Sequence, residues 1–473
     1  MEGSSLLTGK QKLSSSLTGK QKLLKRQKMV NDEGTMSKLP EALISRILSF
    51  LPTKDAVRTS VLSKKWLFRW TFITRLDLDD TVFYSPKKKT GGKMSFLNFV
   101  YRALLLTQTS TFQSFSLLLA NKYDMSLLNT WISNILIRSV RNLRVETHST
   151  MSFSALASHS LFDSNILEEV VLKMDSCAIR VPKTHAEFEN LKLLKLSGIS
   201  FTLHSSSKVL TLSFPLLKVF ETVNCSWLNA NRLHLIVPLL ERVIIAQDAV
   251  SMSNETSRCA IYFSGFCPKQ FSYCGFANIS YYFKLFESSS AHNASVNVVV
   301  NQCSTNRDPE IENRAFLLLN EFRQMKCLKF EGCEVLAQSK LAKLQSFEML
   351  SHLELGVVSG EVLLGLLLKS PILKTLLFKG VSIFDTEVLN SVAVPDCLTS
   401  TLQVVKFHKL HGCEHELCLA KFFMENGLAL ERISFYLVSH RLGKSKIMEE
   451  FKEKLFSFKK GFSFAIIEFS YDD

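Results

Sequence analysis

Apolar residues with helical spacing begin near residue 38 of this chain. They recur every four positions, at Leu39, Leu43, Ile47 and Leu51, with Ile44 and Leu48 beside them. This spacing predicts a helix with one apolar face. Pro40 suits the first turn of that helix, and Pro52 ends it. Thr53 and Asp55 can cap and charge a second helix. The apolar residues of the second helix are Val57, Val61, Leu62, Trp66 and Trp70.

These helices are too short to stand alone. A module of roughly 40 residues buries only a small core. We therefore expect it to pack against a partner or a neighbouring domain. Its basic side chains would suit an acidic partner and speed the encounter with it. They are Arg46, Lys54, Arg58, Lys64, Lys65 and Arg69.

A different pattern fills the rest of the chain. Apolar triplets spaced i, i+3 and i+5 return every 23–28 residues. Their first members are Phe112, Val140, Leu167, Leu191, Leu217, Leu240, Met325, Leu350 and Leu373. Such a period is typical of repeats in which each unit supplies one short strand and a return segment, and neighbours stack into a solenoid. The pattern is weak over 246–324, where Val296, Val298 and Val300 alternate like a strand.

The last seventy or so residues read differently again. Leu402, Val405 and Phe407 continue the strand pattern, while Glu416–Leu430 has helical spacing and Ile433–Val438 and Phe462–Phe469 look like strands. The sequence thus predicts an α/β protein. A small helical module precedes a solenoid of parallel strands with helical or irregular returns, over 94–395, and a C-terminal cap over 396–470.

The distribution of charge and the cysteines bear on the N-terminal arm and on the cellular compartment. The net charge of +14 is concentrated near the N-terminus, where residues 1–36 predict a disordered basic arm containing the segment LTGKQKL twice. A solvated tail is favoured over nuclear-localisation or RNA-binding roles, and nucleic acid is not expected at the nearly neutral body. Eleven unpaired-looking cysteines and the lack of an apolar leader or long apolar run predict a cytoplasmic or nuclear protein without a membrane partner.

One segment has the residue types of a metal site. It contains His408, His411, Cys413, His415 and Cys418, which could meet the tetrahedral demand of zinc. Structural zinc sites usually bring two ligand pairs from separated segments, and no second cluster lies nearby in the sequence. We therefore expect no metal and no cofactor.

Motifs for catalysis are absent from the sequence. It contains no HExxH, no phosphate-binding loop and no GxSxG elbow. Cys327 and Cys333 could be nucleophiles, but nothing beside them in the sequence suggests an activated thiolate. Core packing is the better interpretation, and no catalytic residue is predicted.

Two segments resemble known domains. Residues 37–80 resemble the F-box of plant proteins, through Leu39-Pro40-Glu41, Ile47 to Ser60 and Val61 to Trp66. Residues 396–470 resemble the FBD domain. The matching residues there are Cys397, Leu398, Leu402, Val405, Gly412, Glu416, Leu417, Lys421, Phe422, Glu425, Asn426, Leu430, Glu431 and Ile433. The whole chain is similar to plant F-box/LRR-repeat proteins with a C-terminal FBD domain.

The resemblance implies a role in protein degradation. The F-box would bind the adaptor of an SCF-type cullin–RING ubiquitin ligase, and the leucine-rich repeats would hold a target protein for ubiquitination. The chain would then be a receptor subunit and not an enzyme. The alternative is a leucine-rich repeat scaffold acting outside a ubiquitin ligase. The target, and any small-molecule ligand, stay open.

The same resemblance implies which residues meet the adaptor. They are Leu39, Pro40, Leu43, Ile44, Ile47, Leu48, Leu51, Pro52, Val57, Val61, Leu62, Trp66 and Trp70. Some of them must form the core of the F-box itself. Buried core and apolar interface look alike in a sequence, so the two groups are not separated here.

Overall fold

The computed structural model describes most of the chain after residue 38. The described residues are 39–84, 91–152, 155–203, 208–247, 259–266, 269–276, 280–285, 295–301, 309–322, 324–391, 393–437, 445–458 and 466–471. They form two compact units, one within Met1–Leu78 and Lys93–Thr109 and the other within Asp79–Gly92 and Ser110–Asp473. The basic arm predicted for residues 1–36 lies outside the described residues.

The first unit consists of short helices whose starts are set by proline. The Pro40 carbonyl accepts hydrogen bonds from the N–H groups of Leu43 and Ile44, both at 3.1 Å. Pro52 precedes the next helix in the same way. The first predicted helix is present over Glu41–Ser49. The second is shorter than predicted, because it ends at Arg58. Val61, Trp66 and Trp70 lie in the 3-10 segments and turns that follow it. The elements of this unit are α2 (Glu41–Ser49), α3 (Thr53–Arg58), η2 (Thr59–Val61), η3 (Arg69–Phe72) and most of β1 (Arg75–Asp79) and α4 (Gly92–Leu106).

Thr53 has a different role from the predicted cap. Pro52 takes the N-cap position of α3. The Thr53 hydroxyl is buried and accepts a hydrogen bond from the backbone N–H of Asp77 at 2.7 Å. Thr53 therefore ties α3 to β1, because a buried hydroxyl needs a partner inside the protein.

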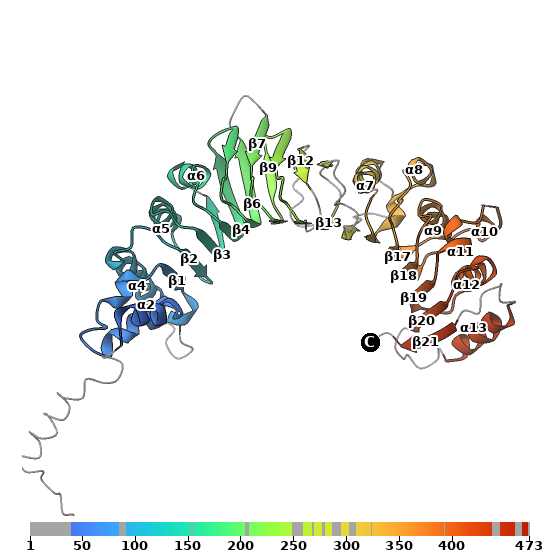
Figure 1. Cartoon of the computed structure of the whole chain (residues 1–473), viewed down its shortest axis with the longest axis horizontal. Helices are drawn as coiled ribbons and strands as arrows, with labels where there is room; N and C mark the ends of the chain where they lie inside the picture. The colour runs from blue at the N-terminus through green and yellow to red at the C-terminus, as the bar shows by residue number, and fades with distance from the viewer. Residues whose placement is uncertain are drawn as a thin grey trace, which may run out of the picture. The chain divides into compact units, whose positions relative to one another are not determined.

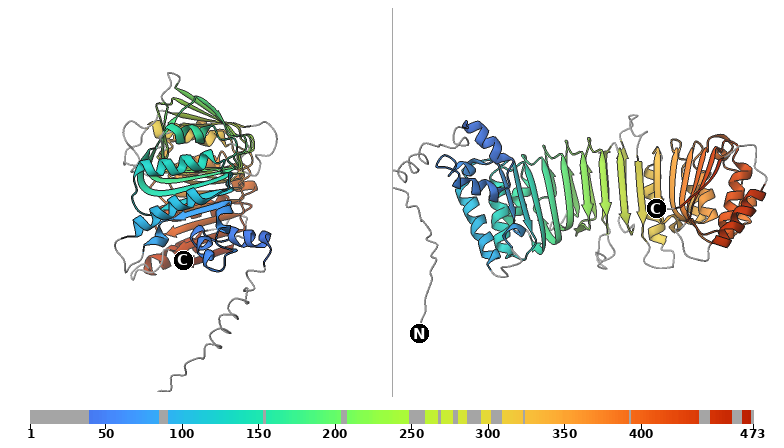
Figure 2. Two further views of the ribbon diagram at one scale, coloured as in Figure 1. Left: turned by 90° about the vertical axis from the view of Figure 1, so that its left-hand side faces the viewer. Right: turned by 90° about the horizontal axis from the view of Figure 1, so that it is seen from below.

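The second unit is built on one long parallel sheet, whose strands lie side by side in Figure 2. Strand follows strand in nearly the order of the chain, one per repeat, which confirms the predicted solenoid. The short strand β9 (Ser226–Leu228) also pairs with this sheet, along β6. The other strands that lie wholly within the second unit are, in spatial order, β2 (Ser114–Leu119), β3 (Asn142–Ser152), β4 (Glu169–Val181), β6 (Leu193–Leu203), β8 (Val219–Val223), β11 (Arg242–Ala246), β13 (Gln270–Gly275), β15 (Ser295–Val300), β16 (Cys327–Glu331), β17 (His352–Val358), β18 (Thr375–Val381), β19 (Val404–Leu410), β20 (Arg432–Leu437) and β21 (Ile466–Tyr471).

The apolar triplets supply the buried side of these strands. Leu353 and Leu355 on β17 are buried, like their equivalents on the other strands. The interval 246–324, where the pattern is weak, contributes two further strands. Phe271 on β13 and Val296 on β15 are buried there in the same way. The repeat array therefore runs through this interval without a break in the sheet.

Helices cover one face of the main sheet on both sides of its middle section, as Figure 1 shows for α5, α6, α8, α9 and α12. Among the described residues, every helix is too short or too polar to cross a bilayer. The helical elements of this unit are η4 (Thr81–Phe83), α5 (Met125–Ile137), α6 (Ala155–Phe162), α7 (Pro309–Glu321), η7 (Cys333–Val335), α8 (Gln338–Lys343), α9 (Gly360–Leu367), α10 (Val388–Ser391), α11 (Asp396–Ser400), α12 (Glu414–Asn426) and α13 (Ser445–Ser457).

In the middle repeats the return segments are strands. They form a second parallel sheet of five strands. Its members are β5 (His185–Glu187), β7 (Val209–Ser213), β10 (Arg232–Ile236), β12 (Ala260–Phe266) and β14 (Ser280–Leu285). Leu210 and Leu212 on β7 are buried while their neighbours are not, because alternate residues of a strand face opposite sides. The returns are thus neither helical nor irregular here.

The C-terminal segment differs from its predicted boundaries by a few residues. The helix predicted over Glu416–Leu430 is α12, which starts at Glu414 and ends at Asn426. Gly427 follows as the C-cap, and Leu430 is buried as the first apolar residue of the next repeat. The predicted strands correspond to β20 and β21, with 438 and 462–465 outside the described residues.

Candidate protein-binding surfaces

The first unit divides the predicted adaptor-binding residues into core and surface. Four form the core, namely Ile44, Leu48, Trp66 and Trp70. Three are half-buried, namely Leu39, Leu51 and Val57. Six are exposed, namely Pro40, Leu43, Ile47, Pro52, Val61 and Leu62. An adaptor interface would therefore use the six exposed residues and the accessible parts of the three half-buried ones.

Aromatic side chains outside the predicted set enlarge this exposed surface. Phe50 is 72% exposed and Phe68 is 63% exposed, and Leu67 and Phe72 are exposed as well. The helical spacing of apolar residues does not identify these four side chains, because they lie away from the buried face of the helices. Their only signal in the sequence is the density of large apolar residues in so short a module. A concentration of exposed apolar side chains marks an interaction surface.

Internal ion pairs reduce the positive charge of this surface. Arg69 pairs with Glu41, and Arg58 pairs with Asp55 at 2.9 Å. The Lys65 ammonium donates a hydrogen bond to the Leu39 carbonyl at 2.7 Å. These groups are exposed, so their pairs add little stability. They leave the surface basic, though less so than the sequence suggests.

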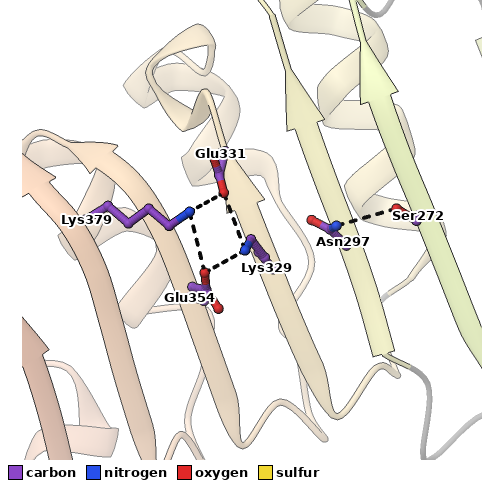
Figure 3. A network of polar contacts seen from close by, with 6 residues as sticks. All are labelled: Ser272, Asn297, Lys329, Glu331, Glu354 and Lys379. Carbon is purple, nitrogen blue, oxygen red and sulfur yellow. Dashed lines mark hydrogen bonds and ion pairs between the residues drawn. The ribbon is translucent and has the colours of Figure 1, made fainter. Parts of the chain in front are cut away.

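The second candidate surface is the face of the main sheet opposite the helices. On β16 to β18, four charged side chains form a network on this open face (Figure 3). Lys329 Nζ lies 2.8 Å from the Glu354 carboxylate and Lys379 Nζ lies 2.6 Å from that of Glu331. Longer contacts of 3.5 Å and 3.9 Å close the ring. The four side chains are about one-third exposed and carry no net charge together.

The backbone explains how Lys379 reaches Glu331 across an intervening strand. The register places Gly356 of β17 at the level of Lys379, and a Cβ on Gly356 would lie 3.2 Å from the Glu331 Cα. Because Gly356 has no side chain, the Lys379 side chain can cross β17 and reach the Glu331 carboxylate. The hydrogen bond from Lys379 holds the pKa of Glu331 below its ordinary value, and the hydrogen bond to Glu354 raises the pKa of Lys329.

Further ion pairs cross the open face nearer the N-terminal end of the sheet. Lys195 of β6 pairs with Glu221 of β8 at 2.8 Å, and Arg144 pairs with Glu146 on β3 at 2.7 Å. Between the two charged regions lie neutral polar groups. The Asn297 amide donates to the Ser272 hydroxyl at 3.4 Å (Figure 3). The open face thus carries ion pairs and polar groups on several strands, with apolar residues such as Ile244 between them.

The metal-like segment is occupied by other contacts. His408 stacks on Tyr436 with ring centroids 4.2 Å apart, and His415 meets Phe384 edge to face at 5.3 Å. Glu416 is buried and accepts hydrogen bonds from the N–H groups of three residues before α12. In the part of the chain that the structure describes, no three His, Cys, Asp or Glu side chains are grouped to hold a metal ion.

Of the two cysteines considered as nucleophiles, Cys333 is a buried core residue and Cys327 is half-buried on β16. Burial raises the pKa of Cys333 to about 12, and its thiol donates to the Val357 carbonyl at 3.4 Å. Burial likewise raises the pKa of Cys397 to about 11. Both thiols are protonated at neutral pH, whereas a nucleophilic cysteine needs a lowered pKa.

Comparison with known families agrees with this geometry. The F-box domain family matches residues 36–71, and the FBD family matches residues 390–435. The chain carries an F-box and an FBD domain. The F-box match ends within η3, and the FBD match runs from α10 to β20. The two domains therefore lie at the two ends of the described chain.

Relatives extend the likeness to the repeats between the two domains. An F-box/FBD/LRR-repeat protein of Arabidopsis thaliana is 28% identical over 455 residues, which are 93% of this chain and 95% of the relative. An F-box/LRR-repeat protein of the same plant is 25% identical over 463 residues, 90% of this chain and 97% of the relative. A third, also an F-box/LRR-repeat protein of that plant, is 34% identical over 210 residues, 44% of this chain and 54% of its own length. This chain therefore has plant F-box/LRR-repeat homologues over most of its length, as its sequence predicts.

Proposed function

We propose that this chain is the substrate-recognition subunit of an SCF-type cullin–RING ubiquitin ligase, with no catalytic role of its own. The observation that carries the proposal is the exposed apolar surface of the F-box. Leu43, Ile47 and Phe50 are exposed on a module whose core is only a few residues deep. Covering such side chains with an adaptor protein removes apolar area from water, which stabilises both the complex and the module.

The repeat array supplies the other half of this function. Its open face offers polar side chains from many successive strands, which suits recognition of a protein target. Because the charges of the β16–β18 network neutralise one another, this part of the face discriminates by geometry more than by net charge. A scaffold acting outside a ubiquitin ligase could use the same face, so adaptor binding is what separates the two functions.

Binding of the purified full chain to the cullin-ligase adaptor tests the proposal. Leu43→Asp together with Ile47→Asp should weaken binding at least tenfold, because two charges would enter an apolar contact. Both residues are exposed, so folding should be retained. Ile383→Asp, an exposed apolar residue of the repeats, is the matched control and should bind like the wild type. A folded wild-type chain that ignores the adaptor at micromolar concentration would leave the scaffold function in its place.

A further inference from the structure

An exposed apolar patch lies outside the F-box match but within the first unit. Helix α4 begins more than twenty residues after that match ends. Its residues Phe96, Val100 and Ala103 are buried. In its last turn, however, Leu105 is 79% exposed and Leu106 is 42% exposed. Two adjacent leucines in water at the end of a helix are not needed for the fold.

Hydrogen bonds hold the residues directly after α4 beside the end of the F-box. The backbone N–H of Gln108 donates to the Thr71 carbonyl at 2.8 Å. The Thr109 hydroxyl donates to the Ile73 carbonyl, also at 2.8 Å. The residue between these two acceptors is Phe72, which directly follows the F-box match and is itself exposed. The residues that follow α4 therefore bond to the end of η3 and to the residue after it.

Charge indicates the chemistry of the partner. The span Gly92–Leu106 contains Lys93 and Arg102 and no acidic residue. The neighbouring F-box is basic as well. A second copy of this chain would bring like charges together, whereas an acidic protein with an apolar contact strip would be attracted.

We propose that the adaptor-binding surface continues from the F-box onto the last turn of α4, with Leu105 and Leu106 as contact residues. This inference rests on the proposed function, because its occupant is the same adaptor, for which the basic surface predicts an acidic contact face. It adds a contact that the F-box match does not contain. The proposed contact is confined to the last turn of α4 and does not include Met94, which lies about 16 Å from Leu105 along the helix.

A charge placed at either end of α4 tests the inference in the full chain. Leu105→Asp should weaken adaptor binding about tenfold or more. Met94→Asp is the matched control, because Met94 is 61% exposed on the same helix, and it should change the dissociation constant less than twofold. In the wild-type protein, adaptor binding should also slow hydrogen exchange of the peptide spanning residues 101–109, which requires no variant.

The possible outcomes separate this inference from the proposed function. If Leu105→Asp binds like the wild type and the exchange of 101–109 is unchanged, while Leu43→Asp with Ile47→Asp abolishes binding, the extension to α4 is wrong and the ligase function stands. If the wild type does not bind the adaptor, both fail. If the wild type self-associates and Leu105→Asp is monomeric, a second copy covers the patch and the inference is overturned.

Discussion

At the level of single residues, the tightest backbone constraint is at two glycines of the main sheet, Gly198 within β6 and Gly332 directly after β16. Gly198 has φ +66° and Gly332 has φ +76°. A Cβ at these positions would lie 1.8 Å and 2.1 Å from the carbonyl oxygens of Met174 and Val300 on the neighbouring strands. Each glycine directly follows a half-buried residue of its strand, Ser197 or Glu331. The same left-handed backbone step therefore occurs in two different repeats. Only glycine fits such a turn without displacing the adjacent strand.

Gly332→Ala should therefore lower the free energy of unfolding by about 3 kcal/mol, near the upper end of the usual cost of backbone strain, because a clash with backbone is added. Gly380→Ala is the control, since its Cβ would meet only the Val357 side chain at 3.5 Å, an ordinary contact. That variant should stay within about 0.5 kcal/mol of the wild type. Urea unfolding of both proteins measures the difference. Equal effects would show that the turn at Gly332 relaxes easily.

At the level of elements, the charged network on β16 to β18 makes a prediction about pH. The pKa of Glu331 is lowered in the folded protein by its hydrogen bond from Lys379. Its stabilising contribution is therefore complete above the ordinary value of 4.5 and is lost as the pH falls through the lower folded value. Lys379→Met should destabilise the protein by about 0.5–1 kcal/mol at neutral pH, as partly exposed pairs do. This difference should shrink on acidification below pH 4.5.

Thermal unfolding of wild type and variant across this pH range is the measurement. Lys406→Met is the matched control, since Lys406 lies on β19 of the same face and, among the described residues, pairs with no carboxylate. Its effect should not vary with pH in this window. A loss of stability in Lys379→Met that is as large at acid pH as at neutral pH would mean that the lysine acts through packing of its stem.

The elements also show what a sequence can and cannot predict here. The triplets locate the main-sheet strands well. Each of these strands has two inward-facing residues at alternate positions, and a further buried residue precedes them by three positions. The triplets do not predict the second sheet, since the expected returns are helical or irregular and the short alternation of β7 and β10 is not recognised as strand. In the F-box, helical spacing finds Ile44 and Leu48 correctly but gives no sign that Phe50 is exposed. An apolar residue of the core and an apolar residue of an interface differ only in whether the chain itself or a partner protein covers them.

At the level of the second unit as a whole, the FBD continues the repeat array. Strand β19 pairs in parallel with β18 across the predicted boundary at residue 396. A row of rings runs through this boundary on the buried side. Phe378 lies 4.5 Å from Phe407, Phe407 lies 4.8 Å from Phe435, and Phe435 lies 5.0 Å from Phe469, between ring centroids. No layer of solvent or linker separates the last repeat from the FBD at these strands.

Phe407→Ala should therefore weaken both sides of the boundary. Truncating a buried phenylalanine costs about 3–5 kcal/mol, and in an array of stacked repeats the loss is felt by both neighbours. Hydrogen exchange should accelerate in peptides of β18 as well as β20. Phe456→Ala is the control, because Phe456 is mostly exposed on α13 and its loss should be close to neutral. If only peptides after residue 396 exchange faster in Phe407→Ala, the FBD unfolds on its own, and the shared row of rings does not couple it to the repeats.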